Sequence, residues 1–176
     1  MKKYLIIAVL AAVGIFNAFY LSIPAYEYWN GENSSALQSI PCDLSESLSC
    51  TGILQNPRAI IFELWGIFQI TKFCTWLSDC YTYSSNFKVA FPMIAAVVYP
   101  ILLLVALWGW FSKSLLPAKI LTVLSAWGIL FNTYVISQEF IVWIFCPLCA
   151  MCTMIIISIC ILSTLIWKTP KLTPQA

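Results

Sequence analysis

The sequence contains no histidine, and charged residues make up only 9% of it. The absence of histidine excludes imidazole general bases and histidine-ligated metal sites, so no metal centre of that kind is expected. The seven carboxylates are scattered singly along the chain, which argues against a hydrolase that works with paired carboxylates. The net charge of +2 does not indicate a nucleic-acid partner, because the basic residues lie at the ends of apolar runs.

Apolar residues are abundant instead, at 61% of the chain, and the mean hydropathy is +0.89. This composition excludes an ordinary soluble domain and predicts an integral membrane protein. Nearly all of the chain is needed for spanning helices and their loops, so we expect a single membrane domain over residues 1–176. The predicted fold class is an all-α bundle of four transmembrane helices. The four apolar runs lie at about residues 4–23, 89–110, 115–136 and 140–167.

Between the first two runs lies an outer loop, residues 24–88, which is the most polar part of the chain. Within it, residues 57–73 are more apolar, and Pro57 is typical of the first turn of a helix. This stretch is too short for a comfortable span and carries Glu63, so we expect a half-helix that lies in the membrane interface. A tight polar turn is expected at residues 137–139, with Glu139 as a solvated turn residue.

The distribution of lysine favours four spans over five, because the positive-inside rule is then satisfied. Both termini are expected in the cytoplasm of a multi-pass cell-membrane protein, and the long loop faces outward. Four of the eight cysteines lie in that loop, which indicates an oxidising compartment. The inner basic residues are Lys2, Lys3, Lys113, Lys119, Lys168 and Lys171, and the outer ones are Arg58, Lys72 and Lys88.

A pair of thiols, Cys146 and Cys149, opens the last apolar run. Residues three apart share one face of a helix, and Pro147 suits a first helical turn. The positive end of the helix dipole favours thiolate, so the pair is predicted to be a redox centre. Cys42 and Cys50 lie on the same side of the membrane, where two dithiols can exchange disulfides. A relay from a soluble partner through both pairs to a quinone is therefore expected.

The order of these motifs resembles the vitamin K epoxide reductase family over nearly the whole chain. The resemblance is carried by the segment from Cys42 to the Ser49-Cys50 ending, by residues 51–59, and by Cys146-Pro147-Leu148-Cys149. It implies a four-helix bundle around a quinone (ubiquinone, menaquinone or a vitamin K-like compound), with the outer loop and half-helix capping the quinone site, and a role in protein disulfide formation. It also implies roles for single residues: Cys50 exchanges with Cys146, Cys42 with the partner, Cys149 faces the quinone, and Asn86 hydrogen-bonds a quinone carbonyl.

Three departures from the family pattern qualify what the resemblance implies. Asn56 stands where serine is usual, and Thr153 stands in the quinone-contact position that animal members fill with tyrosine. The chain ends at Ala176 without the thioredoxin-like domain fused to many bacterial homologues, so a separate thioredoxin-like partner protein is expected. Vitamin K epoxide is the less expected substrate.

The remaining cysteines are interpreted more simply. Cys74 and Cys80 are expected to form a structural disulfide in the loop, with a second shuttle pair as the alternative. Cys152 and Cys160 are expected to pack as small apolar residues. Asn132, inside the third run, is expected to bond another helix rather than a ligand.

Three other functions compete with this relay. A DsbB-type quinone reductase has the same net reaction, but there the CxxC pair precedes the spaced pair, the reverse of the order in this chain. A membrane carrier or sensor of soft metals would use thiolates as ligands. In a purely structural membrane protein, both cysteine pairs would be static disulfides or packed thiols.

Overall fold

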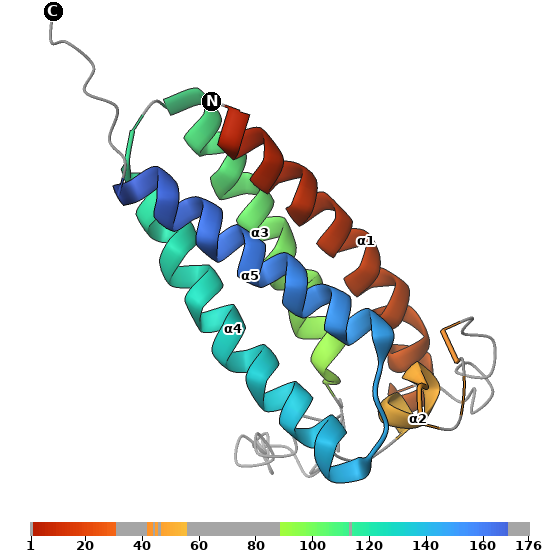
Figure 1. The fold of residues 1–176 in the computed structure, drawn as a ribbon. Helices are drawn as coiled ribbons and strands as arrows, with labels where there is room; N and C mark the ends of the chain where they lie inside the picture. Colours follow the sequence, from red (N-terminus) through yellow and green to blue (C-terminus); the bar gives the residue numbers. More distant parts are fainter. Residues whose placement is uncertain are drawn as a thin grey trace, which may run out of the picture.

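The computed structural model describes residues 2–30, 42–43, 45, 47–55, 89–112 and 114–168. Its elements are α1 (Lys2–Asn30), α2 (Cys50–Gln55), α3 (Phe91–Ser112), α4 (Leu116–Val142) and α5 (Pro147–Lys168), as shown in Figure 1. The predicted half-helix at 57–73, the Cys74–Cys80 pair, Asn56 and Asn86 lie outside the described residues.

The four long helices confirm the predicted fold class. Each is long and apolar enough to cross a membrane, over Lys2–Tyr28, Phe91–Ser112, Leu116–Val142 and Pro147–Lys168. At about 1.5 Å per residue, even the 22-residue helices α3 and α5 reach about 33 Å, slightly more than the hydrocarbon core of a bilayer. The protein is therefore a multi-pass membrane protein with a short fifth helix, α2.

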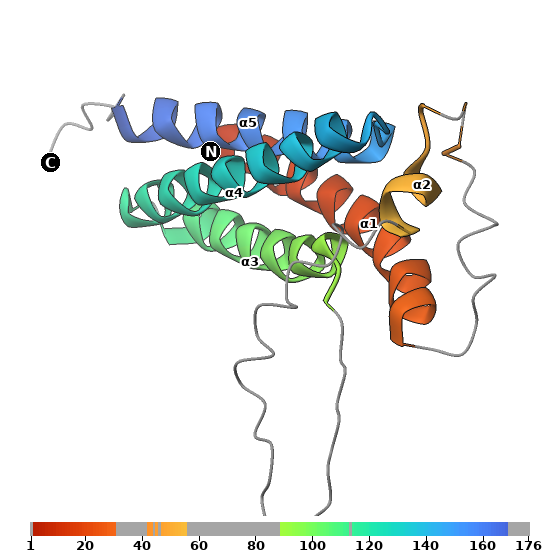
Figure 2. The same ribbon diagram turned by 90° about the horizontal axis from the view of Figure 1, so that it is seen from below.

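The long helices form a bundle in which α1 packs mainly on α3 and also on α5, while α4 packs on α5 and α3. Figure 2 shows α1 crossing obliquely past the other three, with α2 at one end of the bundle, where α4 passes into α5. One apolar cluster fills the middle of the bundle, and a second joins α2 to the start of α5. The second cluster contains Cys50, Cys146 and Cys149.

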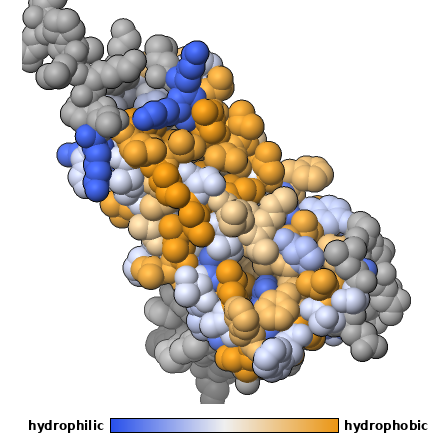
Figure 3. All heavy atoms as spheres, in the orientation of Figure 1, coloured by the Kyte–Doolittle hydropathy of each residue, from blue (hydrophilic) through white to orange (hydrophobic). Residues whose placement is uncertain are grey.

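Large apolar side chains also cover the outside of the bundle, where lipid replaces water. Phe16, Val123 and Trp127 are among those that are more than two-thirds exposed. In Figure 3 the flank of the bundle is largely hydrophobic, and hydrophilic side chains gather at the end that holds the start of α1 and the end of α5. An apolar exterior of this extent is what a lipid environment requires.

Close approach of α1 and α3 depends on glycine. A Cβ atom at Gly14 would overlap the ring of Tyr99, and one at Gly109 would overlap the ring of Tyr4. The Tyr99 hydroxyl, seated over Gly14, donates a hydrogen bond to the carbonyl of Cys152 at 3.0 Å. Small residues that admit a bulky neighbour are typical of helix contacts in membranes.

The first helix is longer than its apolar run. It continues through Pro24 to Asn30, whereas the sequence analysis ended the run at residue 23. Proline is tolerated inside a membrane helix when neighbouring groups satisfy the backbone. Tertiary contact supplies a reason for the extension, because Ala25 is fully buried in the cluster that contains α2.

The polar turn predicted at residues 137–139 is wrong. Helix α4 runs straight through it and ends only at Val142, followed by Trp143 in the left-handed conformation with φ 59°. Ser137 satisfies its hydroxyl within the helix by donating to the carbonyl of Tyr134 at 2.6 Å. Glu139 is buried rather than solvated, with 3% of its surface exposed. Consequently α5 begins at Pro147 and not at residue 140.

Candidate redox site

The loop pair of cysteines is positioned by the capping of α2. Ser49 is the residue before the helix, and its hydroxyl oxygen accepts a hydrogen bond from the Gly52 amide at 2.8 Å. Asp43 completes the cap: its Oδ1 accepts from the Ser49 hydroxyl at 2.8 Å and from the Thr51 amide at 3.0 Å. Serine is a preferred residue at this position because it satisfies amides that the helix leaves free. The Ser-Cys sequence therefore places Cys50 as the first residue of α2.

The cap also controls the ionisation of Asp43. Partial burial alone would raise the pKa of this carboxyl, but hydrogen bonds from Thr51, Ser49 and the Cys50 amide outweigh it. The pKa of Asp43 is therefore lowered from its ordinary value, and the group is a carboxylate at neutral pH.

A short backbone pairing joins this loop to the chain segment before α5. The Ser49 amide donates to the Phe145 carbonyl at 3.1 Å, and the Phe145 amide donates to the Ser47 carbonyl at 2.8 Å. Together they form a parallel bridge between Leu48 and Phe145. Because Cys50 and Cys146 each lie within two residues of this bridge, the pairing brings the two cysteines together.

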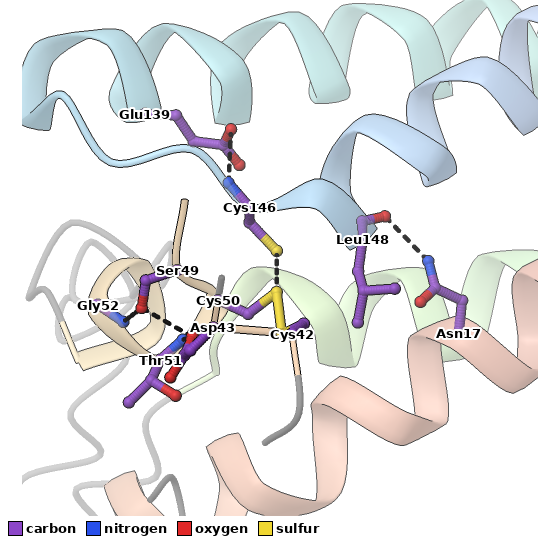
Figure 4. Close-up of a disulfide and its surroundings, with 10 residues drawn as sticks. All are labelled: Asn17, Cys42, Asp43, Ser49, Cys50, Thr51, Gly52, Glu139, Cys146 and Leu148. Atoms are coloured by element: carbon purple, nitrogen blue, oxygen red, sulfur yellow. Dashed lines mark hydrogen bonds between the residues drawn. A yellow bond between two sulfur atoms is a disulfide. The ribbon is translucent and has the colours of Figure 1, made fainter. Parts of the chain in front are cut away.

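The sulfur atoms are arranged for exchange. Cys42 and Cys50 form a disulfide, and Cys146 and Cys149 are free thiols. The Cys146 Sγ lies 2.9 Å from the Cys50 Sγ, with Cys42 bonded beyond it, as Figure 4 shows. A thiolate at Cys146 could attack Cys50 and release Cys42, and the reverse step is equally available. The structure thus brings together three of the four cysteines that the sequence singled out.

The fourth, Cys149, lies on the first turn of α5. Cys146 precedes the helix and its carbonyl accepts hydrogen bonds from the amides of Cys149 and Ala150, both at 3.1 Å. Pro147 occupies the first helical position, where no amide hydrogen is needed. The two thiols are buried, with 1% of Cys146 and 4% of Cys149 exposed.

An apolar cavity of about 180 Å³ adjoins Cys149. An apolar space of about 150 Å³ already accepts a benzene ring, so this one fits a single-ring quinone head group. Its polar lining comes from Asn132, Tyr99 and the two thiols Cys149 and Cys152. The remaining lining residues are Ala18, Leu21, Phe91, Pro92, Ile94, Ala95, Val98, Leu124, Trp127, Gly128, Phe131, Val135 and Ile156.

The structure also describes Thr153, for which a quinone contact is predicted, and Asn132, for which a bond to another helix is predicted. Thr153 is absent from the lining of the cavity, and its hydroxyl donates to the Cys149 carbonyl at 3.0 Å. Asn132 does line the cavity, yet within the described part of the chain its amide makes no hydrogen bond. The interhelical bond expected for Asn132 is therefore not found among those residues.

Two buried polar side chains at the site were missed by the sequence analysis. Asn17, 2% exposed, donates to the Leu148 carbonyl at 2.9 Å and to the Cys152 Sγ at 3.0 Å. Glu139 accepts a hydrogen bond at Oε2 from the Cys146 amide at 3.4 Å. The available signal was a single amide inside the first apolar run and a carboxylate seven positions before the thiol pair. Cys152, expected only to pack, is buried as predicted but also lines the cavity.

Comparisons with known proteins agree with this site. No curated protein matches the chain. Among protein-family models, the one described as "Vitamin K epoxide reductase family" matches residues 5–164, which includes both cysteine pairs and all five helices of the structure except their outermost residues. The chain belongs to the vitamin K epoxide reductase family.

Proposed function

We propose that the protein is a membrane thiol oxidase that passes electrons from a separate thioredoxin-like protein to a quinone and thereby supports disulfide formation in other proteins. The observation that carries the proposal is the 2.9 Å separation between the Cys146 and Cys50 sulfurs. Membership of the vitamin K epoxide reductase family supports it, because quinone-linked disulfide oxidoreductase activity is general in that family.

Electrons enter at the loop pair. A thiolate of the partner attacks Cys42, Cys50 leaves as a thiolate, and the second partner thiolate then displaces Cys42. The partner has lost two electrons and becomes a disulfide, and Cys42 and Cys50 are both reduced.

Electrons then pass to the helix pair when it is oxidised. The Cys50 thiolate attacks Cys146 and Cys149 leaves as a thiolate; Cys42 next attacks Cys50, and Cys146 leaves. The product has a Cys42–Cys50 disulfide and two free thiols at Cys146 and Cys149, which is the arrangement in the structure. The short distance between Cys146 and Cys50 supports this order, since the two sulfurs that have just parted remain neighbours.

The acceptor site is proposed to be the cavity beside Cys149. A bound quinone would supply a two-electron, two-proton acceptor there. The aromatic side chains Phe91, Trp127 and Phe131 provide an apolar surface for a ring, and the Asn132 amide offers a hydrogen-bond donor to a carbonyl. Contacts from Asn86 and Thr153 stay predictions.

The proposed orientation puts the cysteines on the outer face and both termini in the cytoplasm. The exposed Lys2, Lys3, Lys119 and Lys168 support it, since the start of α1 and the end of α5 lie together at the end of the bundle remote from α2 (Figure 1). Lys119 lies 6.0 Å from the ring of Trp167, which assigns it to the same end.

The alternative functions fit less well. A carrier of soft metals needs thiolates, whereas Cys42 and Cys50 are joined in a disulfide. A static structural disulfide gives no reason for a free buried thiol at Cys146 to face it. The order of the motifs differs from that of a DsbB-type reductase, although the net reaction is shared.

The proposal is tested by quinone reduction with purified protein and a reduced thioredoxin-like donor. We expect turnover in the wild type, none above background in Cys149→Ala, and near wild-type turnover in the matched control Cys160→Ala. Cys160 lies on the same helix but outside the cavity lining. Equal turnover in wild type and Cys149→Ala, or no turnover with ubiquinone and menaquinone analogues, would overturn it.

A further inference from the structure

The side chain of Glu139 is the most unusual polar group of the described residues. It lies near the end of α4 with 3% of its surface exposed, although carboxylates are seldom buried without a partner. Its Oε2 accepts one long hydrogen bond from the Cys146 amide, at 3.4 Å. Its Oε1 is buried and has no hydrogen-bond partner among the described residues. A buried polar atom of this kind calls for a specific explanation.

The neighbours of Glu139 are the redox thiols. In the segment leading into α5, the amide of Cys146 contacts one of its oxygens, and on α5 the thiol of Cys149 interacts with the carboxyl. Within the ranges that the structure describes, no lysine or arginine forms an ion pair with it. Among the described residues, Cys149 is thus the titratable side chain that interacts with Glu139, and Cys146 contributes its backbone amide.

The charge of this site must change during turnover. Cys149 needs to be a thiolate to donate electrons, and it leaves as a thiolate when Cys50 attacks Cys146. In a buried site a thiolate beside a carboxylate is strongly disfavoured, because like charges repel more in a low dielectric. A carboxyl that changes its protonation in step with the thiol avoids that state.

We propose that Glu139 is the proton acceptor and donor for the Cys149 thiol. Before electron donation, Cys149–SH and Glu139–COO⁻ become Cys149–S⁻ and Glu139–COOH. When Cys149 is later released from its disulfide as a thiolate, Glu139–COOH returns the proton. The proton that Glu139 takes from Cys149 is the one it returns, so the pair neither gains nor loses a proton over the cycle. The pair carries a single negative charge while Cys149 is free; that charge leaves with the electrons to the quinone, so the pair is neutral while Cys149 is in its disulfide, and it returns when Cys149 is released as a thiolate. The inference rests on the proposed function, in which Cys149 is the thiol that reduces the quinone.

The test follows the reactivity of Cys149 toward N-ethylmaleimide as a function of pH, read by peptide mass spectrometry on the full-length protein. Two groups that share a proton titrate as a pair, in two macroscopic steps. We expect two steps in the wild type and in the matched control Gln138→Ala on the same turn of α4. We expect one step in Glu139→Gln, whose amide keeps the hydrogen bond to Cys146 but cannot take a proton.

Quinone turnover supplies the second readout. General acid–base catalysis is worth roughly a hundredfold or more, so we expect about that loss in Glu139→Gln and partial recovery in Glu139→Asp. A loss of turnover with an unchanged two-step profile would overturn the proposal, since that is the result for a purely structural role. If the Glu139→Gln protein cannot be produced in folded form, Glu139→Asp serves as the test. A shift in the pH of one step of the Cys149 reactivity profile, relative to the wild type, supports proton sharing. An unchanged profile contradicts it.

Failure of the proposed function would be recognised separately. A wild-type protein that reduces no quinone, but whose two-step profile becomes one step in Glu139→Gln, would refute the quinone relay and retain the proton coupling.

Discussion

The sulfur of Cys146 lies 2.9 Å from that of Cys50, although 96 positions separate the two residues in the chain. The local structure around each residue is not sufficient by itself to produce this contact. Cys50 is held by the capped start of α2, Cys146 by the turn into α5, and the Leu48–Phe145 bridge fastens the two segments together. The contact is thus a property of backbone pairing and not of two flexible side chains.

The contact predicts a trapped intermediate. In a Cys42→Ala, Cys149→Ala double variant both resolving thiols are missing, so we expect a Cys50–Cys146 disulfide in most molecules after mild oxidation. Non-reducing peptide mapping would identify it. In the control pair Cys42→Ala, Cys152→Ala, Cys149 remains able to resolve the bond, and much less should accumulate. Equal amounts in both variants would contradict the order of exchange proposed above.

Asn132 predicts a change in quinone affinity. Asn132→Leu keeps the volume of the side chain but removes the donor that lines the cavity, so a hydrogen bond of about 1 kcal/mol is lost. We expect the KM for a short-chain quinone to rise about fivefold with kcat little changed. Quenching of Trp127 fluorescence by the quinone should weaken in parallel. Thr133→Val is the control, because the Thr133 hydroxyl donates within its own helix, to the Ile129 carbonyl, and it should leave both unchanged.

Asn17 predicts a loss of stability at the start of α5. Its amide joins α1 to the Leu148 carbonyl and the Cys152 thiol, and hydrogen bonds between membrane helices contribute about 1 kcal/mol. Asn17→Ala should lower the free energy of unfolding in detergent by about that amount. Ser22→Ala is the control, because the Ser22 hydroxyl donates within its own helix, to Ala18. The role assigned to Asn17 is refuted by an equal loss in the two variants.

The close packing of Gly14 against Tyr99 predicts that an alanine at position 14 destabilises the contact between α1 and α3. Gly14→Ala would displace the Tyr99 ring and break its bond to the Cys152 carbonyl, and overpacking of this kind costs about 1–3 kcal/mol. Unfolding in detergent measures it. Gly128→Ala meets only the side chain of Ile156, at 3.0 Å and beyond, and should cost less. A smaller loss at Gly14 than at Gly128 would contradict the packing described here.

The role of the Asp43 carboxylate in the cap of α2 predicts that the cap becomes less stable at acidic pH. Because its pKa in the folded protein is lowered, the carboxylate stabilises the cap above its ordinary pKa, and this contribution is lost as pH falls through the folded value. Amide exchange at Thr51 and Gly52, corrected for intrinsic rates, should therefore become less protected below about pH 4. Asp43→Asn should remove that pH dependence. Persistence of the dependence in the variant would assign it to another group.

The sequence was sufficient to predict the four-helix architecture, because runs of about 20 apolar residues have few alternatives in a membrane. It was also sufficient to place Cys50 and Cys146 at the same end of the bundle, since the number of spans between them decides the side. The sequence did not predict the contact between their sulfurs at atomic distance. That distance depends on the bridge to Phe145, and such a short pairing has no periodic pattern to reveal it.

Burial was predicted least well. Glu139 sits among residues 137–139, which read as a polar turn, and only the packing of α4 against the start of α5 shows that its carboxyl is enclosed. The same applies to α1, where Pro24 suggested an end but contact with the α2 cluster extends the helix. In both cases contacts with residues distant in the chain determine the local structure, against the local sequence pattern. Such contacts cannot be recognised from a single sequence.

The unequal burial of the two sulfurs of the loop disulfide bears on which of them a partner could attack in the proposed relay. Cys50 has no exposed surface, whereas Cys42 is only partly buried. Under the proposed relay we therefore expect an incoming thiol to bond to Cys42, so that Cys50 is the sulfur that departs. In that step the thiolate of Cys50 would form next to Cys146, whose sulfur lies 2.9 Å away. The difference in burial thus gives two chemically equivalent sulfurs different partners in the proposed relay: Cys42 for the incoming thiol and Cys50 for Cys146.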